Sequence, residues 1–270
     1  MRVTVSGSFD NLRTPHVRFL HEASRIGPVH LLLWSDAVTR ALEGKEPKFP
    51  EEERLYFLEA VRYVERVTLV EELDSADALP ALVSPGPAVW AVTEAGDTPA
   101  KRAFCSQAGI AYRVIRDAEL EGLPAGPVQT ADSGRKKVIV TGCYDWLHSG
   151  HVRFFQETSA LGDLYVVVGN DKNVAFLKGE HHPMFKQDER RYMVGSIRYV
   201  TQALISTGMG WMDAEPQIAE IQPDIYAVNE DGDKPEKRAF CAEHGLQYAV
   251  LQRTPAEGLP RRQSTDLRGF

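Results

Sequence analysis

Short apolar runs alternate with amphipathic stretches along the chain. The runs KVIVTG (137–142) and LYVVVGND (164–171) are rich in Val, which is typical of strands buried on both faces of a sheet. Further strand-like runs lie at 203–207, 225–229 and 247–251. Helical patterns fall between them at 187–200, 216–222 and 234–245. This alternation predicts an α/β fold with a doubly wound parallel sheet.

The same pattern occurs twice in the chain. GSFD at 7–10 corresponds to GCYD at 142–145, and HVRF follows at the same distance in both. Two longer matches follow, ERLYFLEAVRYV with ERRYMVGSIRYV and WAVTEAGDTPAKRAFC with YAVNEDGDKPEKRAFC. We therefore expect two tandem Rossmann-like domains, residues 1–130 and 131–270, joined by the polar stretch TADSGRKK.

The stretch GCYDWLHSGH (142–151) leaves the strand at 137–142 on the edge where doubly wound sheets bind ligands. A helix beginning near His148 would direct backbone N–H groups and the positive end of its dipole toward an anion. Gly150 would let a phosphate approach the backbone, and His148 and His151 can donate hydrogen bonds to neighbouring phosphoryl oxygens. Asp145 is expected to hold the turn rather than to react.

Composition and charge limit the classes of partner that the chain is expected to bind. The net charge of -7 in 270 residues gives no broad cationic field, so bulk binding of nucleic acid or anionic membranes is not expected. The three cysteines (Cys105, Cys143 and Cys241) have no paired spacing, which fits a reducing compartment. The sequence begins without a signal-peptide pattern, and no apolar run approaches the ~20 residues that a membrane span needs. We expect a cytoplasmic protein.

GCYDWLHSGH resembles the signature of the nucleotidyltransferase superfamily, and most of all its cytidylyltransferase branch, which reads Gly-x-Phe-Asp-x-x-His-x-Gly-His. The resemblance continues through the second copy. Lys178 stands where the family has a phosphate-binding lysine, and Arg190 matches a helical arginine near the nucleotide. STDLR at 264–268 resembles the closing Ser-Thr-x-x-Arg signature, which holds phosphate.

The resemblance implies that an acceptor phosphate attacks the α-phosphorus of CTP and expels pyrophosphate. His148, His151, Lys178 and Arg190 would stabilise the transition state, as phosphoryl transfer requires. The implied nucleotide-binding residues are Gly142, Cys143, Tyr144, Asp145, Gly150, Asp231, Ser264, Thr265 and Arg268. Mg²⁺ would be held mainly by the nucleotide phosphates, so no metal cage of protein side chains is expected.

The first copy lacks the residues of this chemistry. Arg13 stands in place of His148, Pro15 in place of Gly150 and Glu43 in place of Lys178, while only His16 remains of the histidine pair. We expect a catalytically silent first domain that packs on the second as an internal pseudo-dimer. Tandem domains also resemble the ethanolamine-phosphate cytidylyltransferases, although here the intact copy comes second.

Other interpretations of these residues stay open at this point. The acceptor could be any small phosphorylated alcohol or sugar, and an adenylyltransferase would use ATP by the same mechanism. A nucleotide-binding regulator or scaffold without turnover is an alternative of a different class. Lys178 could be a solvated loop residue, Arg190 could pair with Asp188 or Glu189, and Ser264 and Thr265 could form an ordinary helix cap.

Overall fold

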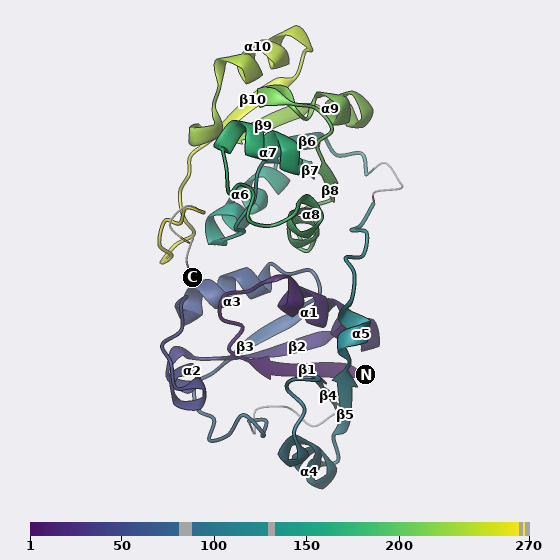
Figure 1. Cartoon of the computed structure of the whole chain (residues 1–270), viewed down its shortest axis with the longest axis vertical. Coiled ribbons are helices and arrows are strands. Elements are labelled where there is room, and N and C mark those ends of the chain that lie inside the picture. The colour runs from purple at the N-terminus through teal and green to yellow at the C-terminus, as the bar shows by residue number, and fades with distance from the viewer. Residues whose placement is uncertain (81–87, 129–132, 265–266, 268–270) are drawn as a thin grey trace. The chain divides into compact units, whose positions relative to one another are not determined.

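The computed structural model describes residues 1–80, 88–128, 133–264 and 267. The chain divides into two compact units, Met1–Gly122 (unit 1) and Leu123–Phe270 (unit 2). Each unit holds a five-stranded parallel sheet with helices between the strands, so the predicted pair of doubly wound α/β folds is confirmed (Figure 1). The units divide at Gly122, whereas the sequence predicted residue 130. The Arg18 guanidinium donates to the Glu119 carbonyl at 2.9 Å and ties this end of unit 1 to its first helix.

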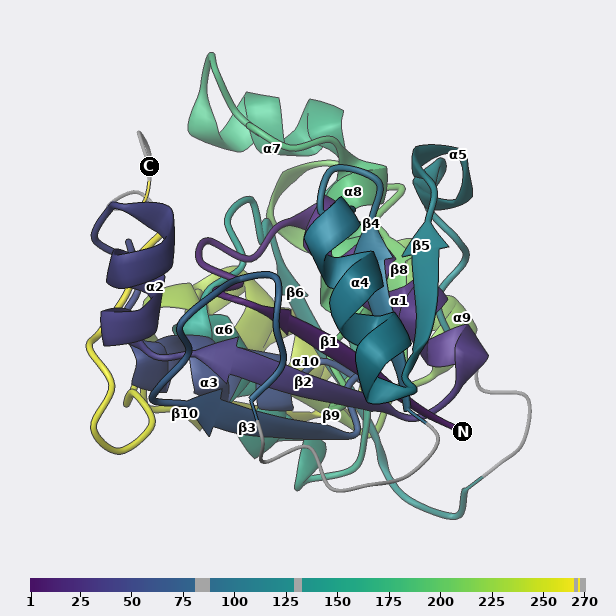
Figure 2. The same ribbon diagram turned by 90° about the horizontal axis from the view of Figure 1, so that it is seen from below.

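Unit 1 contains five strands, and its described helices lie between all consecutive strands except β3 and β4. Its elements are β1 (Arg2–Gly7), α1 (Thr14–Ile26), β2 (Val29–Trp34), α2 (Asp36–Glu43), α3 (Glu51–Glu59), β3 (Arg66–Val70), β4 (Ala88–Thr93), α4 (Pro99–Ala108), β5 (Ala111–Ile115) and α5 (Asp117–Leu120). Figure 2 shows β2 and β3 side by side with their carboxyl ends toward α2.

Unit 2 has the same order of strands, and its described part differs from that of unit 1 by a helix between the third and fourth strands, two short 3-10 helices and no helix after the fifth strand. Its elements are β6 (Lys137–Gly142), α6 (Ser149–Ser159), β7 (Asp163–Val168), α7 (Asp171–Lys178), α8 (Gln187–Gly195), β8 (Gln202–Ile205), η1 (Gly210–Met212), α9 (Glu215–Ile221), β9 (Ile225–Asn229), η2 (Glu230–Gly232), α10 (Pro235–Glu243) and β10 (Gln247–Leu251). No described helix is long and apolar enough to cross a membrane.

The sheet of unit 2 has the strand order β10-β9-β6-β7-β8, so the order reverses between β6 and β9. β6 pairs with β7 along its whole length, from Lys137 with Asp163 to Gly142 with Val168. Its pairing with β9 covers only Val138 with Ile225 and Ile139 with Tyr226. The carboxyl ends of β6 and β9 are therefore unpaired with each other, which leaves room for a ligand at the switch point.

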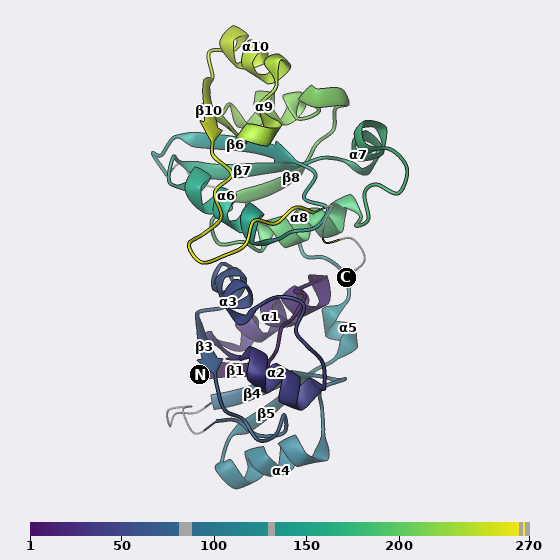
Figure 3. The same cartoon turned by 90° about the vertical axis from the view of Figure 1, so that its left-hand side faces the viewer.

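Helices cover both faces of this sheet. Figure 3 shows α6 and α8 on one face and α9 and α10 on the other. The second face is closed by a core that joins strand residues Ile139, Val167 and Tyr226 to Ile218 of α9 and Cys241 of α10. The buried Cys241 is a core residue, as is Cys105 at the matching place in unit 1. An α6 residue and an α10 residue can thus approach one ligand only from opposite faces.

Two glycines show why both copies begin their second strand in the same way. A Cβ on Gly162 would lie 2.1 Å from the Lys136 carbonyl oxygen, and a Cβ on Gly27 would lie 2.1 Å from the Met1 carbonyl oxygen. The backbone before β7 and β2 therefore passes too close to the first strand for any side chain. This close approach seats the fully buried β7, DLYVVV, beside β6.

The helix expected at 187–200 ends earlier in the structure. α8 stops at Gly195, because the amides of Ser196 and Ile197 bond to carbonyls three residues back, at 3.2 and 3.1 Å, in a tighter turn. Ile197 and Val200 are nevertheless buried. The apolar spacing thus correctly indicated which side chains enter the core but overestimated the length of the helix.

Candidate active site

A cleft opens in unit 2 at the carboxyl ends of β6 and β9. It holds roughly 680 Å³ of empty space, part of it open to solvent. Its walls come from β6 and the turn after it, α6, α7, β9, η2, α10 and the segment after β10. The lining residues are Thr141, Gly142, Cys143, Tyr144, Asp145, His148, Gly150, His151, Phe154, Lys178, Val228, Asn229, Asp231, Gly232, Lys237, Arg253 and Ser264.

His148 is the N-cap residue of α6. Its Nδ1 accepts a hydrogen bond from the backbone N–H of Gly150 at 3.1 Å, so the proton of the neutral ring lies on Nε2. His148 is only 3 % exposed, and Nε2 is buried without a hydrogen-bond partner among the described residues. A buried donor without a partner is costly, and a ligand oxygen in the cleft would satisfy it.

His151 takes part in the same cap. Its Nδ1 accepts from the backbone N–H of His148 at 3.4 Å, and the two rings stack with centroids 3.9 Å apart. In unit 1, His16 accepts from the N–H of Arg13 at 3.0 Å in the same way. The histidine that the two copies share is therefore explained by helix capping, whereas unit 1 has Arg13 rather than a histidine at the position of His148.

Both imidazoles are held neutral. Burial, followed by the charges of Arg253 and Arg262, lowers the pKa of His148 to about 3. Burial, followed by His148, lowers the pKa of His151 well below its ordinary value. Neutral rings whose Nδ1 atoms accept from the backbone present Nε2–H groups, so they suit hydrogen bonding to phosphoryl oxygens rather than proton transfer.

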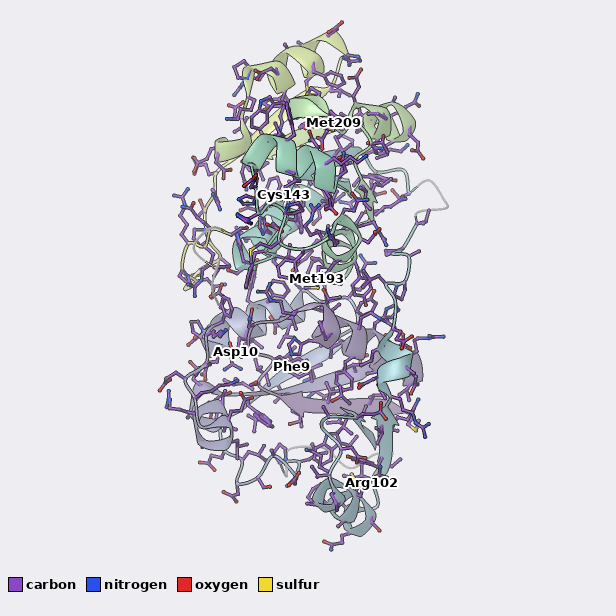
Figure 4. All side chains as sticks on the ribbon, in the orientation of Figure 1. Phe9, Asp10, Arg102, Cys143, Met193 and Met209 are labelled. Atoms are coloured by element: carbon purple, nitrogen blue, oxygen red, sulfur yellow. The ribbon has the colours of Figure 1, made fainter. Side chains whose placement is uncertain are left out.

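Two glycines make room for ring side chains in the cleft. A Cβ on Gly142 would lie 2.7 Å from Cζ of Tyr144, and a Cβ on Gly150 would lie 3.0 Å from Cε1 of His148. Tyr144 has a left-handed backbone with φ of 52°, as Phe9 of unit 1 has with φ of 45°. Cys143, labelled in Figure 4, lies between Gly142 and Tyr144 in this turn. Burial raises the pKa of the Cys143 thiol, which disfavours a reactive thiolate.

Asp145 holds the loop before α8. Its Oδ1 accepts from the backbone N–H groups of Met184 and Phe185 at 2.7 and 3.0 Å. In unit 1, Asp10 binds the N–H groups of Lys48 and Phe49 at 2.8 and 3.0 Å; Figure 4 labels this aspartate. Since the first copy has the same bonds without the histidine pair, they belong to the fold.

Arg190 does not line the cleft. It is 1 % exposed, and its guanidinium donates to the carbonyls of Phe185, Cys143 and Gly169 and to the Asp171 carboxylate at 2.8, 2.6, 2.7 and 2.8 Å. The expected contact between Arg190 and a nucleotide is therefore corrected, because the guanidinium donates its hydrogen bonds to buried groups of unit 2. The interpretation that Arg190 pairs with Asp188 or Glu189 is also corrected, because its carboxylate partner is Asp171.

Unit 1 confirms the structural nature of this arginine. Arg54 donates to the carbonyls of Phe49, Ser8 and Trp34 and to the Asp36 carboxylate at 3.0, 2.5, 2.9 and 2.6 Å. These partners occupy the positions that match those of Arg190. The arginine therefore joins the first strand, the second strand and the loop before the third helix in both units.

Of the remaining predicted residues, three line the cleft and two lie outside the described residues. Lys178, the last residue of α7, and Asp231 of η2 line the cleft. Asp231 forms an ion pair with Arg253 at 2.6 Å, so its carboxylate already has a partner. Ser264 lines the cleft and donates from its hydroxyl to the Trp146 carbonyl at 3.1 Å. Thr265 and Arg268 lie outside the described residues.

Four polar residues that line the cleft were not predicted from the sequence: Thr141, Asn229, Lys237 and Arg253. Arg253 had a detectable signal, because Asp117 stands at its matching position in the first copy and reverses the charge. Lys237 had none, because the motif KRAFC that contains it occurs in both copies. Burial lowers the pKa of Lys237, whose Nζ donates to Thr141 Oγ1 at 3.5 Å.

The arrangement can bind a polyanion. Neutral N–H donors lie at the start of α6, and Lys178 and Lys237 bring positive charge to the same cleft. Within the described part of the chain, no three His, Cys, Asp or Glu side chains gather as a metal site would require.

Comparison with known proteins places this cleft in a family. The cytidylyltransferase-like family model matches residues 139–238. The FAD synthase of Aciduliprofundum boonei is 35% identical over 119 residues, 43% of this chain and 76% of that protein. The bifunctional protein HldE of Campylobacter concisus is 35% identical over 103 residues, 37% of this chain and 21% of that protein.

Among solved structures, the lipopolysaccharide core biosynthesis protein from Thermoplasma volcanium matches with 25% identity and a TM-score of 0.38, covering 45% of this chain and 98% of that protein. The matched residues 139–238 begin in β6 and end in α10, and they include the capping histidines and Lys178. The chain belongs to the cytidylyltransferase-like family of the nucleotidyltransferase superfamily.

Proposed function

We propose that unit 2 transfers a nucleotidyl group from a nucleoside triphosphate to a small phosphorylated acceptor and releases pyrophosphate. The observation that carries this proposal is the buried, unpartnered Nε2 of His148 at the start of α6. A triphosphate oxygen is the partner that this donor lacks, and the helix dipole favours the same anion.

The reaction needs no nucleophile from the protein. An oxygen of the acceptor phosphate attacks the α-phosphorus, a new P–O bond forms, and the bond to the β-phosphate breaks. Pyrophosphate leaves with the electron pair of that bond. The acceptor phosphate is already anionic, so no base has to remove a proton. His148 and His151 donate to the oxygens on which charge accumulates, and Lys178 adds positive charge. Mg²⁺ bound to the phosphates would neutralise further charge.

ATP is the donor that we favour. Support comes from the relatives named FAD synthase, because FAD contains an adenine nucleotide. CTP, which the motif GCYDWLHSGH favoured, is the second candidate, and the description of the matching family model supports it. Both donors present the same triphosphate to His148, His151 and Lys178, so the choice between them concerns the base alone.

Unit 1 is proposed to be catalytically silent. Arg13 occupies the N-cap position of α1, where His148 stands in α6, but a guanidinium has no acceptor for the helix N–H groups. Glu43, at the position that matches Lys178, pairs with Lys45 at 3.1 Å. A carboxylate at this position would repel a triphosphate. The structural bonds of Asp10 and Arg54 are kept, as described above. Packing of unit 1 on unit 2 as a pseudo-dimer, and a cytoplasmic location, stay predictions.

Thermal stability of the full chain with each nucleotide tests the proposal. A ligand that binds the native state at 100 times its Kd stabilises it by about 2.7 kcal/mol. We expect ATP with Mg²⁺, or CTP as the second candidate, to raise the Tm of wild-type protein by more than that of His148→Asn. Asparagine keeps a cap acceptor for the Gly150 amide but removes the Nε2 donor.

The matched control is Arg13→Asn in unit 1, which should respond like wild type. Pyrophosphate release that requires a phosphorylated acceptor separates an enzyme from a scaffold. Nucleotide binding without pyrophosphate release, across a panel of phosphorylated alcohols, sugars and FMN, would favour the regulator or scaffold instead. No response to ATP, CTP, GTP or UTP would exclude the proposed function.

A further inference from the structure

An Asp–Lys pair occupies matching positions in the two units but differs in geometry. DALP at 77–80 corresponds to DAEP at 213–216, and KRAFC at 101–105 corresponds to KRAFC at 237–241. In unit 1, Lys101 Nζ lies 3.3 Å from Asp77 Oδ1, which also accepts from the Thr98 hydroxyl at 2.7 Å. The lysine of unit 1 is therefore neutralised by its own aspartate.

In unit 2 the corresponding residues, Asp213 and Lys237, do not form an ion pair. Lys237 is only 7 % exposed, and its Nζ has Thr141 Oγ1 as hydrogen-bond acceptor at 3.5 Å and the Tyr226 ring at 5.7 Å. Within the described residues, no carboxylate oxygen lies within the 4.0 Å of an ion pair with this ammonium. Asp213 instead approaches the end of β7, where its Oδ2 lies 3.6 Å from the position of a Cβ on Gly169.

Lys237 thus brings an ammonium without a contacting carboxylate to the wall of the cleft, because Asp213 and Asp231, which act to raise its pKa, do not form an ion pair with it among the described residues. Burying an ammonium without a contacting counter-charge is unfavourable, so an anion in the cleft would stabilise this arrangement. Arg253 differs, because Asp231 already pairs with it at 2.6 Å. Tyr226 and Thr141, whose hydroxyls bond to each other at 2.9 Å, complete a polar surface around the lysine.

The position of Lys237 distinguishes it from the histidine pair. Lys237 belongs to α10 and the histidines to α6, and these helices cover opposite faces of the sheet (Figure 3). In phosphoryl transfer the entering and leaving oxygens lie roughly in line on opposite sides of phosphorus. If the leaving pyrophosphate sits at the start of α6, the entering oxygen comes from the side of α10.

We propose that Lys237 binds the phosphomonoester of the acceptor and so holds the nucleophile opposite the leaving group. This inference rests on the proposed function. The ammonium offsets repulsion between the acceptor phosphate and the triphosphate, and the attacking oxygen forms its bond to the α-phosphorus as pyrophosphate departs. The acceptor is then a molecule with a terminal phosphate group, recognised through that group.

The test uses the full chain and inorganic phosphate as the probe. Phosphate is titrated by calorimetry into protein saturated with the α,β-methylene analogue of the nucleotide that stabilises the wild type, which cannot be cleaved. We expect Lys237→Met to weaken phosphate binding at least tenfold, which is about 1.4 kcal/mol. Affinity for the analogue should change less than about twofold. Lys101→Met, the matched control in unit 1, should leave both affinities unchanged.

Several results would overturn the proposal. They are wild-type protein that binds no phosphate, Lys237→Met that binds phosphate like wild type, and Lys237→Met that loses the analogue as strongly as phosphate. The last result would place the lysine in the donor site. The Tm without ligand checks folding, and Lys237→Arg, which keeps the charge, should retain phosphate binding if the methionine variant fails to fold.

Failure of the proposed function gives a different pattern. If no triphosphate binds the wild type, the same phosphate titration is made on nucleotide-free protein. Phosphate binding that depends on Lys237 but not on Lys101 would then support an anion site at Lys237, although the proposed nucleotidyl transfer would be rejected. In an active enzyme, Lys237→Met should raise the KM for the acceptor and leave the KM for the nucleotide unchanged.

Discussion

The Nδ1 atom of His148 accepts the backbone N–H of Gly150 at 3.1 Å, and this one bond decides what the imidazole can do. It caps α6, fixes the proton of the neutral ring on Nε2, and leaves that donor buried in the cleft wall. A histidine that completes the fold with one nitrogen thus keeps the other for a ligand.

His148→Asn should lower the turnover number by on the order of 10² to 10³, because one donor to the transition state is lost. Stability should change little, since asparagine is a favoured N-cap residue. Acceptor-dependent pyrophosphate release measures the effect. Arg13→Asn is the matched control at the N-cap of α1 and should keep wild-type turnover. Equal turnover of His148→Asn and wild type would refute the assigned role.

Gly150→Ala should reduce activity without unfolding the chain. The added Cβ would lie 3.0 Å from Cε1 and 3.1 Å from Nδ1 of His148, so the ring must move and the cap bond must lengthen. Alanine is otherwise well suited to a helix. Turnover and Tm measured on the same preparation separate the two effects. Unchanged turnover would mean that the ring position is not critical.

Arg190→Met should destabilise unit 2 by about 3–5 kcal/mol, because three carbonyl groups and Asp171 lose a buried partner. Arg54→Met should destabilise unit 1 by a similar amount. Urea unfolding of both variants checks this. A stable Arg190→Met protein with a raised KM for the nucleotide would contradict this structural role and support the nucleotide contact that the family resemblance implied.

Burial of His148 predicts a pH dependence of stability. Its pKa is about 3 in the folded chain, below its unfolded value near 6.5, so below pH 6.5 the unfolded state binds the extra proton. Stability that is fully present above pH 6.5 is therefore lost as pH falls toward 3. Wild type should lose about 1.4 kcal/mol per pH unit more than His148→Asn between pH 6 and 4. Urea unfolding at these pH values measures the difference; equal slopes would contradict it.

Much of the fold could be predicted from the internal sequence repeat. The Val-rich runs that became β6 and β7 and the match of GSFD with GCYD led to two parallel sheets, because a buried parallel strand has few compositional alternatives. The cleft was also predictable at the end of β6, since carboxyl ends of parallel strands converge there. His148, His151, Lys178, Asp231 and Ser264 all line it.

What escaped prediction depends on packing between distant segments. Whether Arg190 faces a ligand or a ring of carbonyls is decided by where β6, β7 and the loop before α8 meet, which residue spacing does not encode. Residue spacing also does not show that Asp213 and Lys237 lack the ion pair that the matching Asp77 and Lys101 form in unit 1. Only the three-dimensional comparison of the two copies distinguishes them.

Arg253→Met should weaken nucleotide binding more than Asp231→Asn does. Arg253 lines the cleft and contributes to the lowered pKa of His148, whereas Asp231 is half exposed and serves as its partner. We expect at least a tenfold rise in the nucleotide Kd for Arg253→Met, about 1.4 kcal/mol, and less than about threefold for Asp231→Asn. Calorimetric titration measures both. The reverse order would give Asp231 the direct nucleotide contact.

The most direct test follows the α-phosphate itself. The full chain is incubated with Mg²⁺, a panel of phosphorylated acceptors and ATP or CTP labelled at the α-phosphorus. The account predicts that wild type moves the label onto an acceptor and releases one pyrophosphate per label, while His148→Asn does so at a small fraction of that rate. A wild-type protein that binds nucleotide but never transfers the label would contradict nucleotidyl transfer by this cleft.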